Sequence, residues 1–123
     1  MDKATLEREI TEAMGAHGAW KLKLRKAVES GVLPKPAADI ACDDQCGFGK
    51  WLHGMKGDSA IAGSAHYRDV MSAHAAFHKA AGAVAKMVEQ GRNEAAGAAL
   101  EGADYVGATS KLSRAMRAWK EAG

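Results

Sequence analysis

Residues 65–90, AHYRDVMSAHAAFHKAAGAVAKMVEQ, contain a regular helical pattern. Their apolar and aromatic side chains recur at steps of three and four, which places them on one face of an α-helix. Gly91 follows directly and can end the helix in the left-handed conformation that glycine adopts most readily. We therefore expect a helix from about Ala65 to Gln90. Its buried face comprises Val70, Met71, His74, Phe77, His78, Ala81, Val84 and Val88.

The N-terminal part of the chain has the same spacing. Gly31 can close a first helix over residues 2–30. Pro34 and Pro36 prevent the helix from resuming, so we expect a turn at residues 31–38. The positions that share the apolar face of this helix are Leu6, Ile10, Ala13, His17, Trp20, Leu24 and Val28.

The C-terminal segment is also helical in pattern, but it is rich in glycine. Asn93 can cap a helix that runs to about Lys120. Glycines at positions 97, 102 and 107 each lower helix propensity by about 1 kcal/mol relative to alanine, and close helix packing is one reason to accept that cost. The expected apolar face comprises Leu100, Ala103, Val106, Leu112, Met116 and Trp119.

Both cysteines lie in the glycine-containing segment 39–57. Asp43 or Asp44 can cap a short helix through Phe48, Trp51 and Leu52, so we predict a loop with one or two helical turns. The 123 residues suit one domain, residues 1–123, and long tracts without proline favour an all-α protein. The sequence thus predicts an up-and-down four-helix bundle with a short extra helix that carries the cysteine motif.

Charge and hydropathy exclude several classes of protein. Lys and Arg total 17 against 15 Asp and Glu, and a formal charge of +2 gives no strong attraction to nucleic acid or to an anionic membrane. The chain has no apolar run of about 18 residues, and its start, MDKATLEREI, is unlike a secretion signal. We expect a cytoplasmic protein without direct membrane insertion, unless the chain is part of a larger membrane protein. Its two cysteines then suit metal binding or thiol chemistry better than a disulfide.

Three histidines and one cysteine form a candidate zinc site. His74 and His78 are four residues apart, which places both imidazoles on one helix face, although such a pair alone is weak evidence. His17 occupies a core position of the first helix, where an unpaired polar ring would cost about 1–3 kcal/mol. Cys46 adds a thiolate, and three imidazoles with one thiolate suit a closed tetrahedral Zn²⁺ site.

We assign no metal-binding role to the other two histidines or to the other cysteine. His53 and His66 are expected to be exposed to solvent and not to bind the metal. Cys42 is interpreted as a bystander, although oxidation could bring it to the other cysteine. Core aromatic residues should separate the site from water, namely Trp20, Trp51 and Phe77.

Three motifs in this order resemble the chemoreceptor zinc-binding domain, or CZB domain: His17-Gly-Ala-Trp20, Cys46-Gly-Phe-Gly-Lys-Trp51-Leu52 and His74-Ala-Ala-Phe77-His78. The resemblance implies a cytoplasmic zinc-binding bundle, commonly homodimeric, found on bacterial chemoreceptors and diguanylate cyclases. Zinc occupancy or thiol oxidation tunes the output in such proteins. The family's ligand set carries over to His17, Cys46, His74 and His78.

The sequence therefore favours a sensory or regulatory zinc domain that is not an enzyme and that acts on a signalling output domain or protein. Two alternatives stay open. In a zinc hydrolase or lyase, Cys46 would be a displaceable ligand, but no carboxylate at a motif position offers a base. In a dimerisation module, the zinc would be purely structural.

Overall fold

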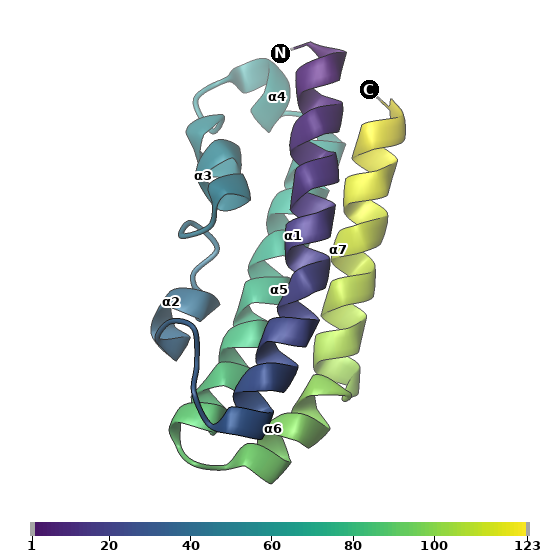
Figure 1. Cartoon of the computed structure of the whole chain (residues 1–123). Helices are drawn as coiled ribbons and strands as arrows, with labels where there is room; N and C mark the ends of the chain where they lie inside the picture. The colour runs from purple at the N-terminus through teal and green to yellow at the C-terminus, as the bar shows by residue number, and fades with distance from the viewer. Residues whose placement is uncertain (1, 123) are drawn as a thin grey trace.

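The computed structural model describes residues 2–122, and this range is entirely helical apart from its connections (Figure 1). It contains seven α-helices and no strand, which confirms the all-α fold class. Within the same range, no helix is both long and apolar enough to cross a membrane. The helices are α1 (Lys3–Ser30), α2 (Ala37–Ala41), α3 (Gly47–Gly54), α4 (Ser59–Ala62), α5 (Ala65–Glu89), α6 (Asn93–Leu100) and α7 (Ala103–Ala122).

The helices form a bundle with three long columns and one interrupted column (Figure 1). α1 lies beside α5 and α7, and α6 leads into α7 at the end of the bundle where α5 stops. The short helices α2, α3 and α4 follow one another along α5 and α1 and occupy the fourth column. The predicted short helix with the cysteine motif is α3. That residues 1–123 form a single domain stays a prediction.

The ends of the long helices agree with the sequence. Gly31 and Gly91 both have a φ of 75°, the left-handed conformation that favours glycine. At its start, α1 is capped by Asp2, whose carboxylate accepts a hydrogen bond from the backbone N–H of Thr5 at 2.7 Å. The predicted bounds of α1 and α5 are therefore correct to within a residue.

The connections contain more helix than the pattern predicts. α2 begins at Ala37, inside the expected turn, directly after Pro36. α4 begins after Asp58, whose carboxylate accepts hydrogen bonds from the N–H groups of Ala60 and Ile61 at 3.1 and 3.4 Å. Elements of four or five residues are too short to show a hydrophobic period, so only their local caps could reveal them.

The expectation of one continuous C-terminal helix is wrong. α6 ends at Leu100 and α7 begins at Ala103, with Gly102 in the break. Glycine is the weakest helix former apart from proline, and the break occurs at one of the three glycines that weaken this segment. Asn93, which the sequence predicts as the cap, is instead the first residue of α6, and Arg92 occupies the cap position.

The break changes which side chains α7 buries. Val106, expected in the core, is 41% exposed, whereas the neighbouring Tyr105 is buried. At the break, Glu101 lies 3.3 Å from the Lys21 ammonium and 2.9 Å from the Arg25 guanidinium, both on α1. These pairs are exposed to solvent, so each contributes little to stability.

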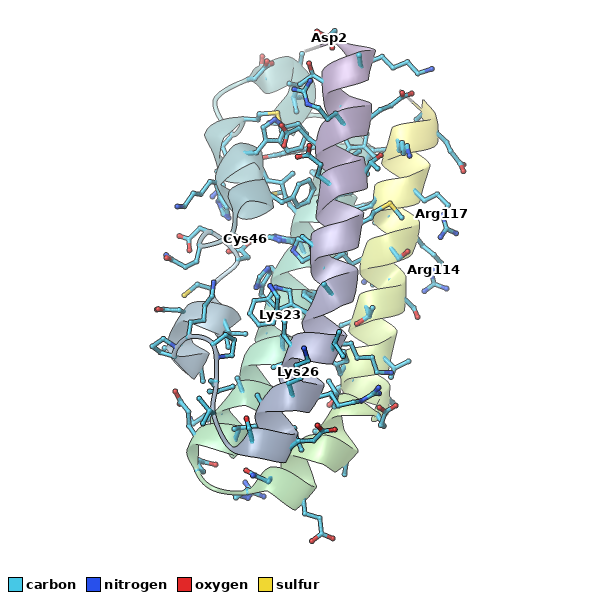
Figure 2. The ribbon with its side chains drawn as sticks, in the orientation of Figure 1. Asp2, Lys23, Lys26, Cys46, Arg114 and Arg117 are labelled. Carbon is cyan, nitrogen blue, oxygen red and sulfur yellow. The ribbon has the colours of Figure 1, made fainter. Side chains whose placement is uncertain are left out.

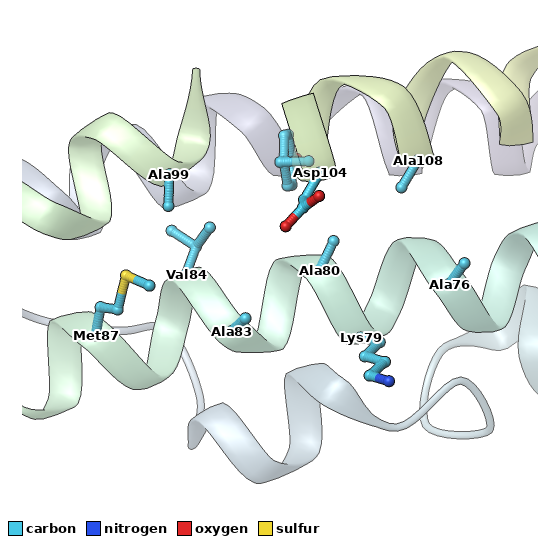
Figure 3. A pocket seen from close by; sticks show the side chains of 10 residues that line it. Ala76, Lys79, Ala80, Ala83, Val84, Met87, Ala99, Asp104 and Ala108 are labelled. Carbon is cyan, nitrogen blue, oxygen red and sulfur yellow. The ribbon is translucent and has the colours of Figure 1, made fainter. Parts of the chain in front are cut away.

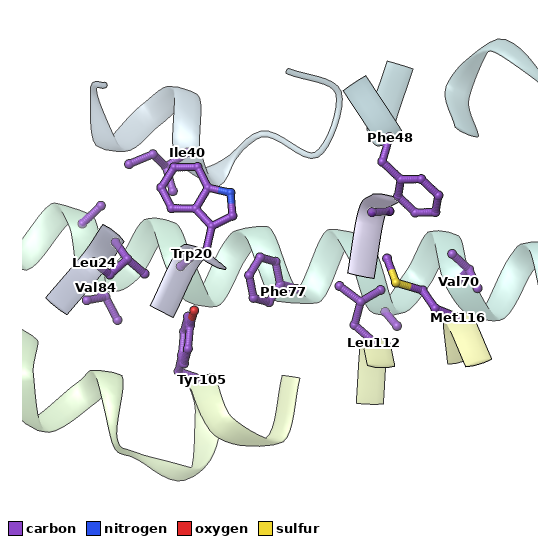
Figure 4. Packing of buried hydrophobic residues seen from close by; sticks show 14 of the residues in the cluster. Trp20, Leu24, Ile40, Phe48, Val70, Phe77, Val84, Tyr105, Leu112 and Met116 are labelled. Atoms are coloured by element: carbon purple, nitrogen blue, oxygen red, sulfur yellow. The ribbon is translucent and has the colours of Figure 1, made fainter. Parts of the chain in front are cut away.

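An apolar core fills the space between the columns (Figure 4). α2 packs closely against α5 at Gly82. A Cβ added at this position would lie 2.7 Å from the Cα of Ala41. Only glycine permits this approach. The core side chains labelled in Figure 4 are Trp20, Leu24, Ile40, Phe48, Val70, Phe77, Val84, Tyr105, Leu112 and Met116.

Beside the α6–α7 break, α5 borders a groove of about 360 Å³ (Figure 3). Half of its lining residues are alanines, and its charged residues are Lys79 and Asp104. No histidine or cysteine lines this groove, so it is separate from the site described next.

Candidate metal centre

The structure brings together all four residues that the sequence predicts as metal ligands. His17 lies on α1, His74 and His78 lie on α5, and Cys46 directly precedes α3 (Figure 2). Their ligand atoms all lie within 4.8 Å of one another. The histidines are buried, with exposed fractions of 6%, 0% and 3%, and the cysteine is partly exposed. Three segments distant in sequence therefore form one cluster.

The distances between donor atoms match the edges of a zinc tetrahedron. The Nε2 atoms are 3.0 Å apart for His17 and His74, 3.1 Å for His74 and His78, and 3.3 Å for His17 and His78. The Sγ atom of Cys46 lies 3.9, 3.4 and 3.6 Å from the Nε2 atoms of His17, His74 and His78. Zn–N bonds of about 2.0 Å and a Zn–S bond of about 2.3 Å give edges of about 3.3 and 3.5 Å.

The hydrogen bonds of two rings direct lone pairs into the cluster. Nδ1 of His17 lies 2.7 Å from the carbonyl oxygen of Ala13, and Nδ1 of His78 lies 2.8 Å from that of Ile40. A carbonyl oxygen only accepts, so each Nδ1 carries the proton and donates it. In a neutral ring, Nε2 then has a lone pair and no proton. The two Nε2 atoms, 3.3 Å apart, therefore cannot bond to each other, and a shared cation would satisfy both.

Burial keeps these rings neutral at physiological pH. It lowers the pKa of His17 to about 4, although the hydrogen bond to Ala13 acts in the opposite direction. It lowers the pKa of His74 to about 3, with a further contribution from the neighbouring His78 and His17. Burial also lowers the pKa of His78. Neutral imidazoles are the form that binds metal, so the site is prepared for a cation.

The sulfur of Cys46 also caps a helix. Cys46 is the N-cap of α3, and its Sγ accepts a hydrogen bond from the N–H of Gly49 at 3.3 Å. The predicted caps, Asp43 and Asp44, are wrong because α3 begins at Gly47 and both aspartates lie in the preceding turn. One atom thus serves both the cluster and the start of α3.

Comparison with known proteins agrees with this geometry. The sequence model of the chemoreceptor zinc-binding domain matches residues 17–85, more than half of the chain. The chain belongs to this family. It is therefore a zinc-binding signalling domain, and the matched region includes all four clustered residues. No curated protein and no solved structure matches the chain.

In this CZB domain, Asp43 and His53 form a clasp beside the metal centre. Nε2 of His53 lies 3.1 Å from Oδ2 of Asp43, and the two side chains are only 28% and 24% exposed. Asp43 lies in the turn that leads to Cys46, whereas His53 lies on α3. The clasp therefore ties the cysteine turn to the helix that follows it. The expectation that His53 is exposed to solvent is only partly correct, because its side chain is partly buried against Asp43. No sequence period marks a pair ten residues apart.

Loss of the clasp should loosen the cysteine turn. We expect His53→Gln to lower the free energy of unfolding by about 1 kcal/mol. We also expect zinc release from the CZB domain to accelerate about three- to tenfold, because Cys46 would be held less firmly. Chemical denaturation and transfer of zinc to a chromogenic chelator measure the two effects. His66→Gln, at the start of α5 and outside the cluster, is the matched control. Equal release rates for the two variants would contradict this role.

Aromatic rings enclose the metal centre of the CZB domain on two sides. Phe48 and Phe77 pack against the histidines with ring centroids 5.3–5.9 Å away. Trp51, expected in this wall, lies one layer further out, stacked on Phe48 and 5.8 Å from the ring of Trp119 on α7. Trp20 is buried in the core. Sequence reasoning missed Phe48 as a wall residue, although it belongs to the cysteine motif.

Cys42 lies outside the cluster. Its thiol is exposed and donates a hydrogen bond to the carbonyl oxygen of Ala38 at 3.2 Å. Its interpretation as a bystander stays a prediction, and the residue offers a matched control for substitution of the second cysteine.

Proposed function

We propose that this CZB domain is the zinc-dependent sensory or regulatory part of a bacterial signalling system that controls chemotaxis or cyclic-di-GMP. Its four zinc ligands are His17, Cys46, His74 and His78. The proposal rests on one observation in the buried cluster. The Nε2 atoms of His17 and His78 direct their lone pairs toward each other across 3.3 Å, and the thiol of Cys46 completes the set of donors. Such an arrangement is unfavourable without a cation and favourable with one.

Zinc supplies a positive charge shared by α1, α3 and α5. Each of these helices, or the residue that caps it, contributes at least one donor atom. Binding therefore stabilises the arrangement in which all four donors converge, by an amount that grows with zinc concentration. Changes in zinc supply become changes in the stability of this arrangement.

The Cys46 sulfur is the ligand that responds to zinc supply and to oxidants. The three histidines lie within long helices, whereas Cys46 lies at the end of a turn and is partly exposed. Zinc scarcity, or oxidation of the thiol toward sulfenic acid, removes this donor. Because the same sulfur caps α3, its oxidation or displacement also disturbs the start of that helix. Because Trp51 on α3 contacts Trp119 on α7, a shift of α3 reaches the C-terminal column of the bundle.

A competitive zinc titration tests the assignment. We expect Cys46→Ala to weaken zinc binding at least about 100-fold, since one of four direct ligands is lost. Cys42→Ser removes the other thiol and should leave the affinity within about twofold of the original, because Cys42 is outside the cluster. If Cys46→Ala binds zinc as tightly as the unmodified protein, the assignment of the ligands fails.

We further propose that the domain is not an enzyme. The thiol of Cys46 lies 3.4–3.9 Å from the three Nε2 atoms and so occupies the fourth vertex, which a catalytic zinc would keep for water.

Chelation of the zinc distinguishes a sensor from a structural site. If the zinc were purely structural, its removal would unfold the chain. A sensor should keep most of its helical circular dichroism under the same treatment.

The partners follow from the family and are proposals as well. We propose that the domain acts as a cytoplasmic homodimer and regulates a chemoreceptor or diguanylate cyclase output. Nucleic acid and membrane lipid are not expected partners, because the charge of the chain is nearly balanced. Measurement of the oligomeric state during the zinc titration tests the homodimer.

A further inference from the structure

A groove leads from the surface to the metal centre between α1 and the start of α3. It has a volume of about 280 Å³, and both His17 and Cys46 line it. Small residues, among them Ala16 and Gly47, border the groove and leave the sulfur accessible. His17 is only 6% exposed, and its Nε2 lone pair belongs to the donor cluster behind the groove. The groove therefore ends on atoms that bind cations.

The charged residues that line this groove are both acidic. Glu9 and Glu12 lie on α1, one to two turns before His17. Neither forms an ion pair with another residue of the described range 2–122, whereas the neighbouring Glu7 lies 3.9 Å from the Lys3 ammonium. Two uncompensated negative charges therefore face the path to Cys46.

A second cavity touches the site but has a different character. It has a volume of about 120 Å³, lies between α1, α5 and α7, and reaches His17 without reaching Cys46. Its lining is apolar or hydroxylic, with Phe77 and Thr109 as examples, and contains no acidic or basic residue besides the imidazole. Of these two cavities, the acidic groove is the one that combines charge with access to the sulfur.

We propose that the acidic groove is the path by which zinc enters and leaves the domain, and that Glu9 and Glu12 select by charge what reaches Cys46. Negative charges in a groove with low-dielectric walls attract cations and repel anions, and such fields change association rates about tenfold or more. The part of this inference that concerns zinc rests on the function proposed above. The two carboxylates are not ligands of the cluster, and they act on the rate at which charged species arrive.

Two thiol reagents of similar size and opposite charge test the groove. In zinc-loaded Cys42→Ser protein, the Cys46 sulfur attacks a methanethiosulfonate that carries either a trimethylammonium or a sulfonate group. A mixed disulfide forms, and methanesulfinate leaves. Mass spectrometry gives both rates, each divided by the rate for free cysteine. We expect the cationic reagent to be favoured about three- to tenfold, and we expect Glu9→Gln with Glu12→Gln to abolish this preference.

The control removes two charges from α1 outside the groove. Glu7→Gln with Glu29→Gln should preserve the preference, and only the groove variant should slow zinc association, with a difference that shrinks at high salt. An unchanged preference in the groove variant, or equal changes in both variants, would overturn the proposal. Because the reagents report on Cys46 itself, the charge preference stays measurable even if the zinc titration refutes the ligand assignment.

Discussion

Gly49→Ala is expected to destabilise the protein by about 3 kcal/mol and to weaken zinc binding about 100-fold. A Cβ at position 49 would overlap the carbonyl oxygen of Asp43 and approach the Cα of Asp44 to 3.2 Å. Both contacts are with backbone, so no side-chain rotation relieves them. The turn before Cys46 would have to move, and the sulfur would move with it. Urea denaturation and a competitive zinc titration measure the two losses.

Gly47→Ala is the matched control for this substitution. Gly47 also lies in the first turn of α3, but a Cβ there has no neighbouring atom within 4 Å. Because alanine favours a helix over glycine by up to about 1 kcal/mol, this variant should be as stable as the original or slightly more stable. Similar losses in both variants would show that the backbone contact at Gly49 is not what positions Cys46.

Acidification is expected to unfold the metal-free protein steeply below pH 6.5. The pKa of His17 is about 4 and that of His74 about 3 in the folded protein, and burial also lowers the pKa of His78. In the unfolded chain, an imidazole has a pKa of about 6.5. Above that pH, both states are neutral and stability does not depend on these rings.

Between pH 6.5 and the folded pKa values, the unfolded chain binds protons that the folded chain does not accept. Each such histidine lowers the free energy of unfolding by about 1.4 kcal/mol per pH unit as the pH falls. His17 and His74 together therefore lower the free energy of unfolding by about 2.7 kcal/mol per pH unit, and His78 adds to this loss. A fall of about two to three pH units removes an amount comparable to the usual stability of a small domain. Urea denaturation of chelator-treated protein at several pH values measures this slope.

Substitution shows whether the buried rings cause the slope. His74→Leu should reduce it by about 1.4 kcal/mol per pH unit, because that ring no longer titrates. His66→Gln, which changes a histidine outside the cluster, should leave the slope intact. A metal-free protein that is equally stable at pH 7 and pH 5 would contradict the assignment of three neutral buried imidazoles.

Much of this protein could be predicted from its sequence because the decisive signals are local. The apolar positions of α1 and α5 recur with the period of a helix, and Gly31 and Gly91 mark their ends. His17 occurs in the apolar pattern of one helix, and His74 with His78 in that of the other. A polar ring in a buried stripe requires a partner, and this requirement indicates a metal centre from the sequence alone.

The tertiary structure alone decided how these parts fit together. The helix breaks at Gly102, and Tyr105 is buried in place of Val106. Both features depend on packing between helices, whose energy can override the helix propensity of a single segment. The clasp between Asp43 and His53 and the acidic groove before Cys46 are equally absent from any sequence period, because they join side chains through space. The sequence determined which residues could bind zinc, since residue type and helical phase are local properties. Their distances, their protonation and the access to them depend on contacts between distant segments, and only the folded chain has those contacts.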